Sequence, residues 1–486
     1  MAGMIDSPLF GDLYSTAEMR EVWSDEATIQ RWLDVEAALA RAQARLGIIP
    51  TEHAEEISRK ARVALIDLVE LRRQLEQTRH PIVPLIRALG RVCDPAAAEL
   101  IHWGATTQDI LDTALVLQLK TAHAIVVRDL AVTHRVLREL ARRHRDTIQA
   151  GRTHGQQALP ITFGYKVAVW VAEVGRHLER LDEVAPRVFR GQFGGGVGTL
   201  AAIGNQGFAL QTLLFADLGL GVPDIAWHTA RDTLAELVCV YALVGSTLAK
   251  IANEIITLQR TELGEVEEPF HHGKVGSSTM PHKRNPSMCE HVAALGRLLA
   301  AQVAPALAGM LADSERDKRS GVAEHAFLAE SNCLLAGMLR STNTILTGLH
   351  VYPENMAQNL TVLQGLLLSE HVMLALATRI GRQKAHELVY ELCMDAIERR
   401  LPLKPLLLED PRVSPHLPEE ELDALLDPRR YTGLAGALVD RVAGPPEMAP
   451  PRDGVDRHAS GENLAPPHPR PPAWRWLKPR WPRRAR

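Results

Sequence analysis

Apolar residues recur at helical spacing over three unusually long segments of the chain. Residues 112–146 contain neither glycine nor proline. Residues 231–259 place apolar side chains three and four positions apart with many more between them, so this helix should be covered on most sides. A third helix is predicted from about residue 286 to residue 311. Helices of about 30 residues are roughly 45 Å long, which favours a long helical bundle that several subunits share.

The remaining sequence divides the chain into four regions. Residues 1–110 are predicted to form an N-terminal domain of short helices and loops, and residues 111–350 contain the long helices of a central domain. Residues 351–443 are predicted to form a small C-terminal helical domain with proline-containing loops. Residues 444–486 are rich in proline and arginine, which is typical of a disordered tail. Two interpretations of this tail stay open: a segment that binds an acidic surface, and an unselected extension.

Composition favours a helical, water-soluble protein. Of the 486 residues 46% are hydrophobic and 23% charged, but only 5% are aromatic, which favours helix over sheet. A net charge of -3 argues against nucleic acid or an acidic membrane as partner. No membrane span or signal peptide is expected, because no stretch of about 18 apolar residues lacks charged or amide side chains, and no basic region precedes an apolar run. Five scattered cysteines indicate buried thiols in a reducing compartment, so we expect a cytoplasmic protein.

One loop between two predicted helices concentrates groups that could do chemistry. It reads "GSSTMPHKRNP" and spans residues 276–286, and we call it the signature loop. The cation of Lys283, the amide of Asn285 and backbone N–H groups near Gly276 can together hold a carboxylate, or a carbanion delocalised into one. Ser277 could act as a base if the same donors stabilised its alkoxide. The alternative is an ordinary solvated surface loop.

Two further polar clusters interrupt apolar sequence. "HWGATTQDI" places Thr106, Thr107 and Gln108 just before the helix predicted from residue 112. Such residues cap helices, but with the helix dipole they also suit an anion. "GRTHGQQALP" places Thr153 and His154 in a loop of small and hydrogen-bonding residues, where a histidine is either functional or simply polar surface. The sequence has no His, Cys or carboxylate cluster at metal-ligand spacing and no phosphate-binding glycine loop after a strand, so no metal or organic cofactor is expected.

The signature loop resembles the pattern GSSxMPxKxNP of the fumarase/aspartase superfamily. "GATTQD" and "RTHGQQALPIT" resemble that family's first and second conserved regions, and "RDTLAEL" and "TELGEVEEPF" are also similar to it. The resemblance covers about residues 5–443. It implies an all-α, three-domain fold and a homotetramer with a central 20-helix bundle, to which each chain contributes five long helices. It also implies active sites assembled from three subunits around a small dicarboxylate substrate.

The resemblance also implies a role for each matching residue. Ser277 is similar to the catalytic base that removes a proton from the carbon next to a carboxylate, while Lys283 and Asn285 match the residues that hold this carboxylate. His154 matches a histidine that assists the leaving group, and Glu290 matches the glutamate that orients it. The remaining substrate-binding residues implied are His80, Thr106, Thr107, Gln108, Thr153 and Arg316.

Within the superfamily, the C-terminal stretch is similar to adenylosuccinate lyases and 3-carboxy-cis,cis-muconate cycloisomerases. Two departures bear on the substrate. His80 is followed by Pro81 where adenylosuccinate lyases usually carry His-Asp, and His154 stands where bacterial cycloisomerases often carry Trp. The sequence therefore favours a carbon–nitrogen lyase that performs β-elimination on a substituted succinate. It would release fumarate and an amine, or nitrite as a nitrosuccinate lyase does. A lactonising cycloisomerase, an adenylosuccinate lyase and a non-catalytic relative are the alternatives.

Overall fold

The computed structural model describes residues 3–270, 273 and 276–444. The described residues belong to one compact unit. The tail predicted at residues 444–486, for which both interpretations stay open, lies outside the described residues from residue 445 onward.

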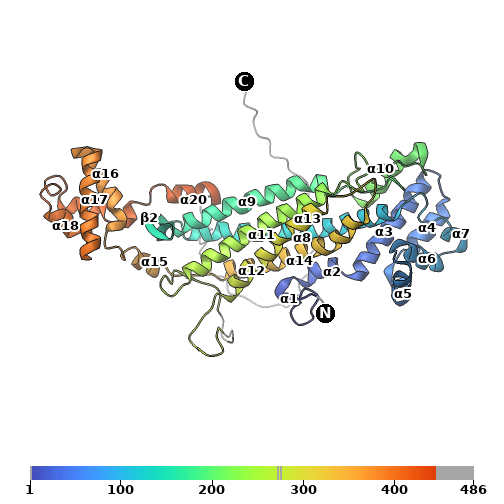
Figure 1. Ribbon diagram of the computed structural model, residues 1–486, viewed down its shortest axis with the longest axis horizontal. Helices are drawn as coiled ribbons and strands as arrows, with labels where there is room; N and C mark the ends of the chain where they lie inside the picture. Colours follow the sequence, from blue (N-terminus) through green and yellow to red (C-terminus); the bar gives the residue numbers. More distant parts are fainter. Residues whose placement is uncertain (1–2, 271–272, 274–275, 445–486) are drawn as a thin grey trace, which may run out of the picture. The chain divides into compact units, whose positions relative to one another are not determined.

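Long helices packed side by side form the centre of the unit, as Figure 1 shows. They are α8 (Thr107–Arg143), α9 (Phe163–Val188), α11 (Asp232–Leu258), α12 (Ser287–Ala301) and α14 (Lys318–Thr347). α8 contacts α9 and α14, and α11 contacts α9, α12 and α14. The predicted helices at 112–146 and 231–259 correspond to α8 and α11, and the all-α prediction is confirmed. α9 and α14 were not among the predicted segments, because Gly175, Pro186, Gly321 and Gly337 interrupt their patterns.

The third predicted helix, from residue 286 to 311, is wrong as a continuous element. α12 ends at Ala301, and a separate helix α13 (Val303–Ala308) follows. Pro305 explains the break, because proline has no backbone N–H and its ring clashes with the carbonyl four residues earlier, that of Ala301. The start of α8 also differs from the prediction, since the helix begins at Thr107 rather than at residue 112.

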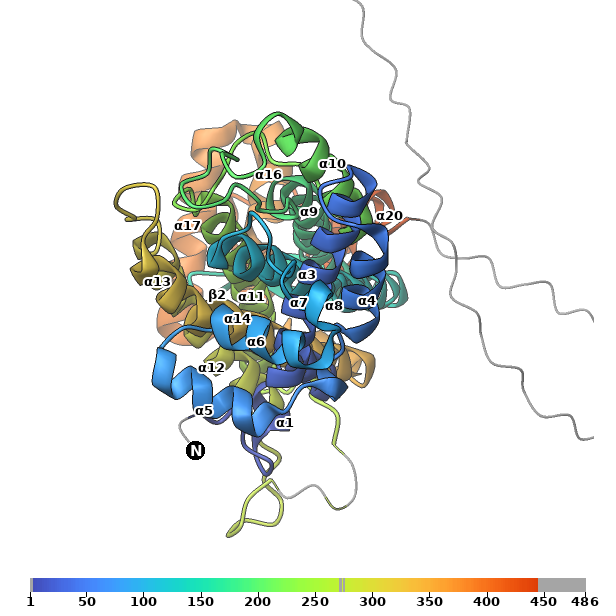
Figure 2. The same ribbon diagram turned by 90° about the vertical axis from the view of Figure 1, so that its right-hand side faces the viewer.

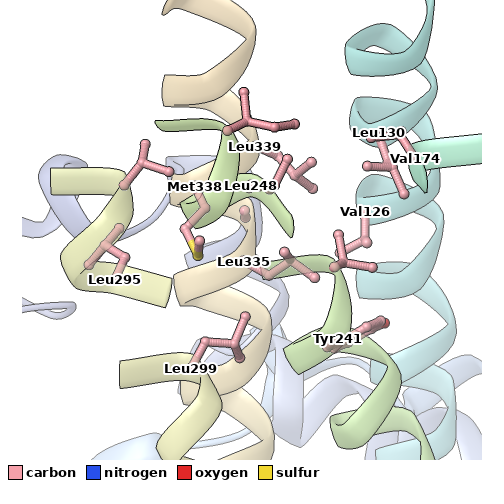
Figure 3. Close-up of a cluster of buried hydrophobic side chains, with 14 of the residues drawn as sticks. Val126, Leu130, Val174, Tyr241, Leu248, Leu295, Leu299, Leu335, Met338 and Leu339 are labelled. Carbon is pink, nitrogen blue, oxygen red and sulfur yellow. The ribbon is translucent and has the colours of Figure 1, made fainter. Parts of the chain in front are cut away.

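The bundle core is formed by apolar side chains from all five long helices (Figure 3). The side chains labelled there are Val126, Leu130, Val174, Tyr241, Leu248, Leu295, Leu299, Leu335, Met338 and Leu339. Each is at most 1% exposed. Burying one such aliphatic side chain stabilises a fold by roughly 1.5–3 kcal/mol, so this cluster is the main source of stability of the central bundle.

In the part of the chain that the structure describes, three helical stretches are long and apolar enough to cross a membrane by length and composition alone. In Thr107–Arg143 and Asp232–Leu258, 61% of the most apolar window is buried inside the structure, whereas in Ser287–Ala308 the share is 33%. Most of the apolar surface of the first two is therefore covered by the other helices of the chain. The third keeps much of its apolar surface uncovered.

The N-terminal elements from α3 onward lie at one end of the bundle, the end that faces the viewer in Figure 2. They are α3 (Asp25–Arg45), α4 (Thr51–Lys60), η1 (Val63–Leu65), α5 (Leu68–Thr78), α6 (Ile82–Val92) and α7 (Pro95–Ala98). The first two helices, α1 (Gly11–Tyr14) and α2 (Ala17–Val22), lie along the bundle instead and contact α14. A later segment, with η2 (Gly204–Gln206) and α10 (Gly207–Leu218), shares one hydrophobic cluster with α3 to α7 through Leu210, Leu214 and Phe215.

The C-terminal elements lie at the other end of the bundle (Figure 1). They are α15 (Pro353–Asn359), η3 (Leu366–Leu368), α16 (Ser369–Ile380), α17 (Arg382–Arg399), α18 (Leu403–Glu409), α19 (Glu419–Leu425), η4 (Pro428–Arg430) and α20 (Ala435–Ala443). Helices α16 to α19 have a hydrophobic cluster of their own. α20 instead packs on α8 and α9, where Arg145 donates to both carboxylate oxygens of Asp440 at 2.8 and 2.7 Å. The predicted domain limits at 110, 350 and 443 stay a prediction.

Two short antiparallel hydrogen-bonded pairs complete the described structure. β1 (Ile148–Thr153) pairs with β2 (Gln156–Thr162), directly after α8, and β3 (Val266–Glu267) pairs with β4 (His350–Val351). The first pair occupies the segment that the sequence analysis treated as a loop. β3 is followed, a few residues later, by the signature loop.

Candidate active site

A cavity of about 390 Å³ opens beside the first turn of α8, and we call it the α8 cavity. Its lining includes His80, Thr107, Gln108 and Arg316, which come from the segment before α6, from α8 and from the segment before α14. The structure therefore brings four of the predicted substrate-binding residues together. Thr106 lies next to them as the N-cap residue of α8.

The start of α8 is held by the carboxylate of Asp109, which is fully buried. Its oxygens accept the backbone N–H of Thr106 at 3.0 Å and those of Gly194 and Gly195 at 2.9 Å each. The Nε2 atom of His228 lies 2.9 Å from the same carboxylate. Four donors thus surround one acidic group, which satisfies the charge and fixes the helix cap against two distant segments.

Two further contacts extend this network to the cavity lining. Gln108 donates from Nε2 to the backbone carbonyl of His228 at 2.8 Å. Arg316 donates from Nη2 to the carbonyl of Gly196 at 2.6 Å, one residue beyond the glycines that bind Asp109. Gln108 and Arg316 are therefore tied to the two segments that fix the cap, Gln108 by a part-buried contact and Arg316 by an exposed one.

His80 has a defined tautomer in this arrangement. The backbone N–H of Val83 donates to His80 Nδ1 at 3.2 Å, so the ring proton is on Nε2, which donates to the hydroxyl of Thr107 at 3.0 Å. Burial, together with the nearby charge of Lys318 and the ring of His102, holds the pKa of His80 below its ordinary value of 6.5. His80 is consequently neutral at neutral pH and can orient Thr107 toward a bound anion.

The wall of the α8 cavity contains a buried ion triad. Arg231, at 3% exposure, donates to both oxygens of Asp112 at 2.8 and 3.0 Å and to Glu324 at 2.7 Å. Asp112 and Glu324 both line the cavity, and Arg231 offsets one of their two charges. Arg316 and Lys318 contribute positive charge to the same lining, so the cavity is suited to a carboxylate.

Thr153 and His154 lie at the tip of the β1–β2 hairpin. Thr153 pairs with Gln156, and the two residues between them, His154 and Gly155, have φ values of 52° and 78°. A two-residue loop with positive φ at both positions is the type I′ turn, in which glycine at the second position is strongly favoured. The segment predicted as a loop is a hairpin, so that prediction is wrong. The turn of the hairpin holds an exposed His154 in a defined backbone conformation.

The signature loop closes on itself through Gly276. A Cβ atom added to Gly276 would lie 2.0 Å from the carbonyl oxygen of Lys283, so only glycine fits at this close approach. Asn285 donates from Nδ2 to the carbonyl of Gly276 at 2.6 Å. Lys283 itself is exposed. The loop is thus internally braced while its cationic group stays accessible.

The hydroxyl oxygen of Ser277 is the acceptor of two backbone donors. The N–H groups of Thr279 and Met280 donate to Ser277 Oγ at 3.2 and 3.0 Å. This pattern is a common turn motif, but it also provides the condition for a serine base, because two N–H dipoles stabilise negative charge on that oxygen. Glu290 is exposed in the first turn of α12, and within the described chain no hydrogen bond joins it to His154. The predicted Glu290–His154 pair therefore stays a prediction.

The chain keeps the predicted groups in separate places. Thr107 is the first residue of α8, and the His154 hairpin follows the end of that helix, which has 37 residues. At 1.5 Å per residue the helix is roughly 55 Å long, so His154 cannot reach the α8 cavity of its own chain. Figure 1 shows β2 at the opposite end of the bundle from α3 to α7. The residues that line the α8 cavity include none of Ser277, Lys283 and Asn285, all three of which the structure describes.

Comparison with known proteins identifies the family of this chain. Residues 14–304 match the family model described as lyase, and residues 365–442 match that of the adenylosuccinate lyase C-terminus. The chain belongs to the fumarase/aspartase superfamily. It is 44% identical over 439 residues to the N-acetyl-S-(2-succino)cysteine lyase of Dickeya dadantii, with 90% of this chain and 96% of that protein covered.

Two further proteins are similar to this enzyme over nearly their whole length. The 3-carboxy-cis,cis-muconate cycloisomerase of Pseudomonas aeruginosa is 42% identical over 445 residues, which are 91% of this chain and 97% of that protein. The crystal structure of a fumarate lyase from Mesorhizobium sp. BNC1 superposes with a TM-score of 0.85 at 42% identity, covering 90% of this chain and 100% of that one. The resemblance inferred from the signature loop is confirmed.

Several residues that fix the candidate active site were not predicted from the sequence. Asp109 and His228 are 119 positions apart, and their pairing could not be read from either position alone. A weak signal existed in the three consecutive glycines at 194–196, since such runs often mark a close backbone approach. Glu265 and Glu268 in "TELGEVEEPF" were noted only for their resemblance, yet both are buried acids with several donors.

Within the described residues, no group of three His, Cys, Asp or Glu side chains is placed to hold a metal ion. The expectation that the enzyme needs no cofactor remains a prediction.

Proposed function

We propose that this enzyme catalyses β-elimination from a 2-substituted succinate and releases fumarate. The observation that carries the proposal is the pair of backbone N–H groups on the oxygen of Ser277, on a loop that also presents Lys283. A serine hydroxyl is too weak a base on its own, but an alkoxide stabilised by fixed donors in a closed site can remove a proton from carbon.

The steps follow from the chemistry of the groups. Ser277 takes the proton from the carbon next to a carboxylate, and Lys283 and Asn285 stabilise the charge that this carboxylate gains. The electron pair then forms the carbon–carbon double bond while the bond to the substituent breaks, and the substituent leaves with its electron pair. Thr107, Gln108 and the other groups at the α8 cavity hold the second carboxylate.

We propose a nitrogen-centred leaving group, an amine or nitrite, as the sequence predicts from the retained His154. A second candidate is a thiolate, because the Dickeya dadantii relative acts on N-acetyl-S-(2-succino)cysteine. An amine is strongly basic and needs a proton from a general acid, whereas nitrite and a thiolate need less help. Lactone formation from a carboxymuconate is the alternative reaction that the cycloisomerase relative supports. Cleavage of adenylosuccinate is a further alternative reaction, which the match to the adenylosuccinate lyase C-terminus supports.

We also propose that the enzyme is a homotetramer whose active sites combine groups from different subunits. The separation of His154 from the α8 cavity supports this, as does a groove of about 720 Å³ along α9, α11 and α12. Apolar side chains stay exposed at Leu243, Leu298 and Leu307, which are 50%, 46% and 50% accessible. Further copies of the chain would cover these side chains, as obligate interfaces do.

The reaction is tested by incubating the enzyme with a panel and following fumarate by its ultraviolet absorbance. The panel contains aspartate, nitrosuccinate, an S-(2-succino)cysteine derivative, adenylosuccinate and 3-carboxy-cis,cis-muconate, with Ser277→Ala as the matched control. Fumarate from one of the first four, absent with Ser277→Ala, supports the proposal. Lactone from the last compound, without fumarate from the others, would replace it with the cycloisomerase reaction.

The shared site is tested by mixing two impaired variants, Thr107→Ala and Ser277→Ala, after dissociation and reassociation, since Ser277 does not line the α8 cavity of its own chain. Hybrid oligomers would contain some sites with both native residues, so activity should return. A light-scattering mass of a monomer at micromolar concentration, or no recovery in reassociated oligomers, would refute the assembly.

A further inference from the structure

The geometry points to Glu265 as a positioning residue for His154: its buried carboxylate fixes the β1–β2 hairpin to the strand that leads into the signature loop. This inference rests on the proposed function for the role of His154 in the reaction. It concerns a residue that does not touch the reacting atoms and acts through the hairpin.

The carboxylate of Glu265 has no exposed surface and accepts four hydrogen bonds. Arg152 donates to Oε1 at 2.7 Å and to Oε2 at 3.0 Å, in the bidentate arrangement that arginine forms with carboxylates. Gln149 donates from Nε2 at 2.7 Å, and Asn359 donates from Nδ2 at 2.8 Å. Two of these partners lie on β1 and the third ends α15, so one acidic group joins three segments.

The hairpin needs such an anchor. An isolated two-stranded hairpin is marginally stable in water. The base of this one packs into a small hydrophobic cluster through Ile148 and Ala150, but its tip lies beyond a register shift between Ala150 and Arg152. Arg152 is two residues before His154, so the bidentate contact defines the position of the turn. Asn359 adds a contact to the second strand, because its backbone carbonyl accepts Nε2 of Gln157 at 2.9 Å.

Neighbouring acids of the same short segment hold the other reactive loop. The carboxylate of Glu268 accepts the backbone N–H groups of Met288 and Cys289 at 3.2 and 3.0 Å, in the first turn of α12. Glu267 lies 3.2 Å from Nη1 of Arg284, inside the signature loop. Residues 265–268 therefore brace both the His154 hairpin and the end of the Ser277 loop within one chain.

A substitution can remove the charge of Glu265 and keep the size of its side chain. Glu265→Gln keeps the size of the side chain but loses one acceptor and leaves Arg152 as a buried cation without its counter-charge. We expect the hairpin to loosen while the helices of the bundle keep their packing. A misplacement of about 1 Å at a general acid costs on the order of 10²-fold in rate.

The decisive readout compares two substrates on the full-length enzyme. With Glu265→Gln, kcat should fall about 10²-fold for a substrate with an amine leaving group, which needs the His154 proton. It should change only a few-fold for nitrosuccinate, whose leaving group is weakly basic. Glu18→Gln, which removes an acid from a surface ion pair with Arg128, is the matched control and should change neither. Equal losses on both substrates would overturn the inference, since a general loss of structure has no such selectivity.

A second measurement does not depend on activity. Hydrogen exchange followed by mass spectrometry should show faster exchange in residues 148–162 of Glu265→Gln and unchanged exchange in α8. If no panel compound yields fumarate, the proposed function fails, but this exchange result still supports or refutes the anchor. If Glu265→Gln does not fold, the uncharged pair Glu265→Gln with Arg152→Met should fold and show the same loose hairpin. A hairpin as protected as in the native enzyme, in either folded variant, would refute the role.

Discussion

The α8 cavity and the signature loop hold their functional groups in opposite ways. At the α8 cavity, the organising carboxylate of Asp109 is fully buried and its four donors come from three parts of the chain. In the signature loop, Lys283 is exposed, and the hydrogen bonds of Ser277 and Asn285 stay within the loop. The first region is fixed by buried contacts from distant segments. The second is held around Ser277 by its own turn, and Glu267 contacts it only near its end, at Arg284.

This difference corresponds to two steps of the proposed reaction. A carboxylate that does not react is best held by groups already in place, because preorganised donors need no rearrangement on binding. A serine base needs a site that is free of water when it acts and open when substrate enters. A braced but exposed loop meets both needs if substrate and neighbouring subunits cover it.

Removing the base should have the largest effect on activity. Ser277→Ala is expected to lower kcat by on the order of 10²–10⁴-fold, as for a positioned general base, while substrate still binds. Steady-state kinetics gives the first quantity, and equilibrium binding by calorimetry gives the second. A near-normal kcat with any fumarate-yielding substrate would show that the loop does not supply the base.

Removing the charge of Asp109 should instead affect the fold around the α8 cavity. Asp109→Asn replaces an acceptor oxygen by a donor facing backbone N–H groups, so folding stability should fall by roughly 3–5 kcal/mol, as when a buried ion pair is broken. KM should rise more than kcat falls. Denaturant unfolding and kinetics measure the two, and Asp12→Asn, in a surface pair with Arg20, is the control. Unchanged stability would mean that the cavity is not held as the geometry indicates.

Removing the imidazole of His154 tests the role of the β1–β2 hairpin in the reaction. His154→Ala should lower kcat about 10²-fold if the leaving group is an amine, and only a few-fold for nitrite or a thiolate. Because His154 is exposed on a turn, thermal stability should stay unchanged. A large loss for every leaving group would show that His154 does more than deliver a proton.

Acid should weaken the bundle that both regions share. His123 on α8 is 6% exposed, and burial lowers its pKa from 6.5 to about 4. Between pH 6.5 and 4 the imidazole of His123 binds a proton in the unfolded chain but not in the folded chain. Folding stability therefore falls as the pH falls through that window. The contribution is on the order of 1–3 kcal/mol. Denaturant unfolding at several pH values measures it, and His123→Gln should flatten the dependence; an equally steep dependence in that variant would assign it to other groups.

Removing the tail should have the smallest effect. An enzyme that ends at residue 445 is expected to keep kcat/KM within about two-fold, because the tail composition cannot form a core. A loss of most activity would mean that the tail contributes to one of the two regions.

The sequence alone determined the family, the helical class and the local chemistry. An eleven-residue loop identifies its own residues, and uninterrupted helical periodicity locates α8 and α11, because both signals are local. The break at Pro305 was readable in principle, since proline disrupts a helix by covalent geometry alone. The I′ turn was also local, in the His154-Gly155 pair, but the strands beside it do not alternate clearly.

Only the tertiary structure decided which groups lie together. The partners of Asp109 come from positions 106, 194, 195 and 228, and those of Glu265 from 149, 152 and 359. Hydrogen bonds between such distant positions leave no periodic trace in the sequence, because each depends on how whole helices pack. The same holds for the separation of His154 from the α8 cavity, which follows from the length and direction of α8. Short sequence motifs identify the reactive residues. Their hydrogen-bond partners and their distances from one another follow from the packing of the folded bundle.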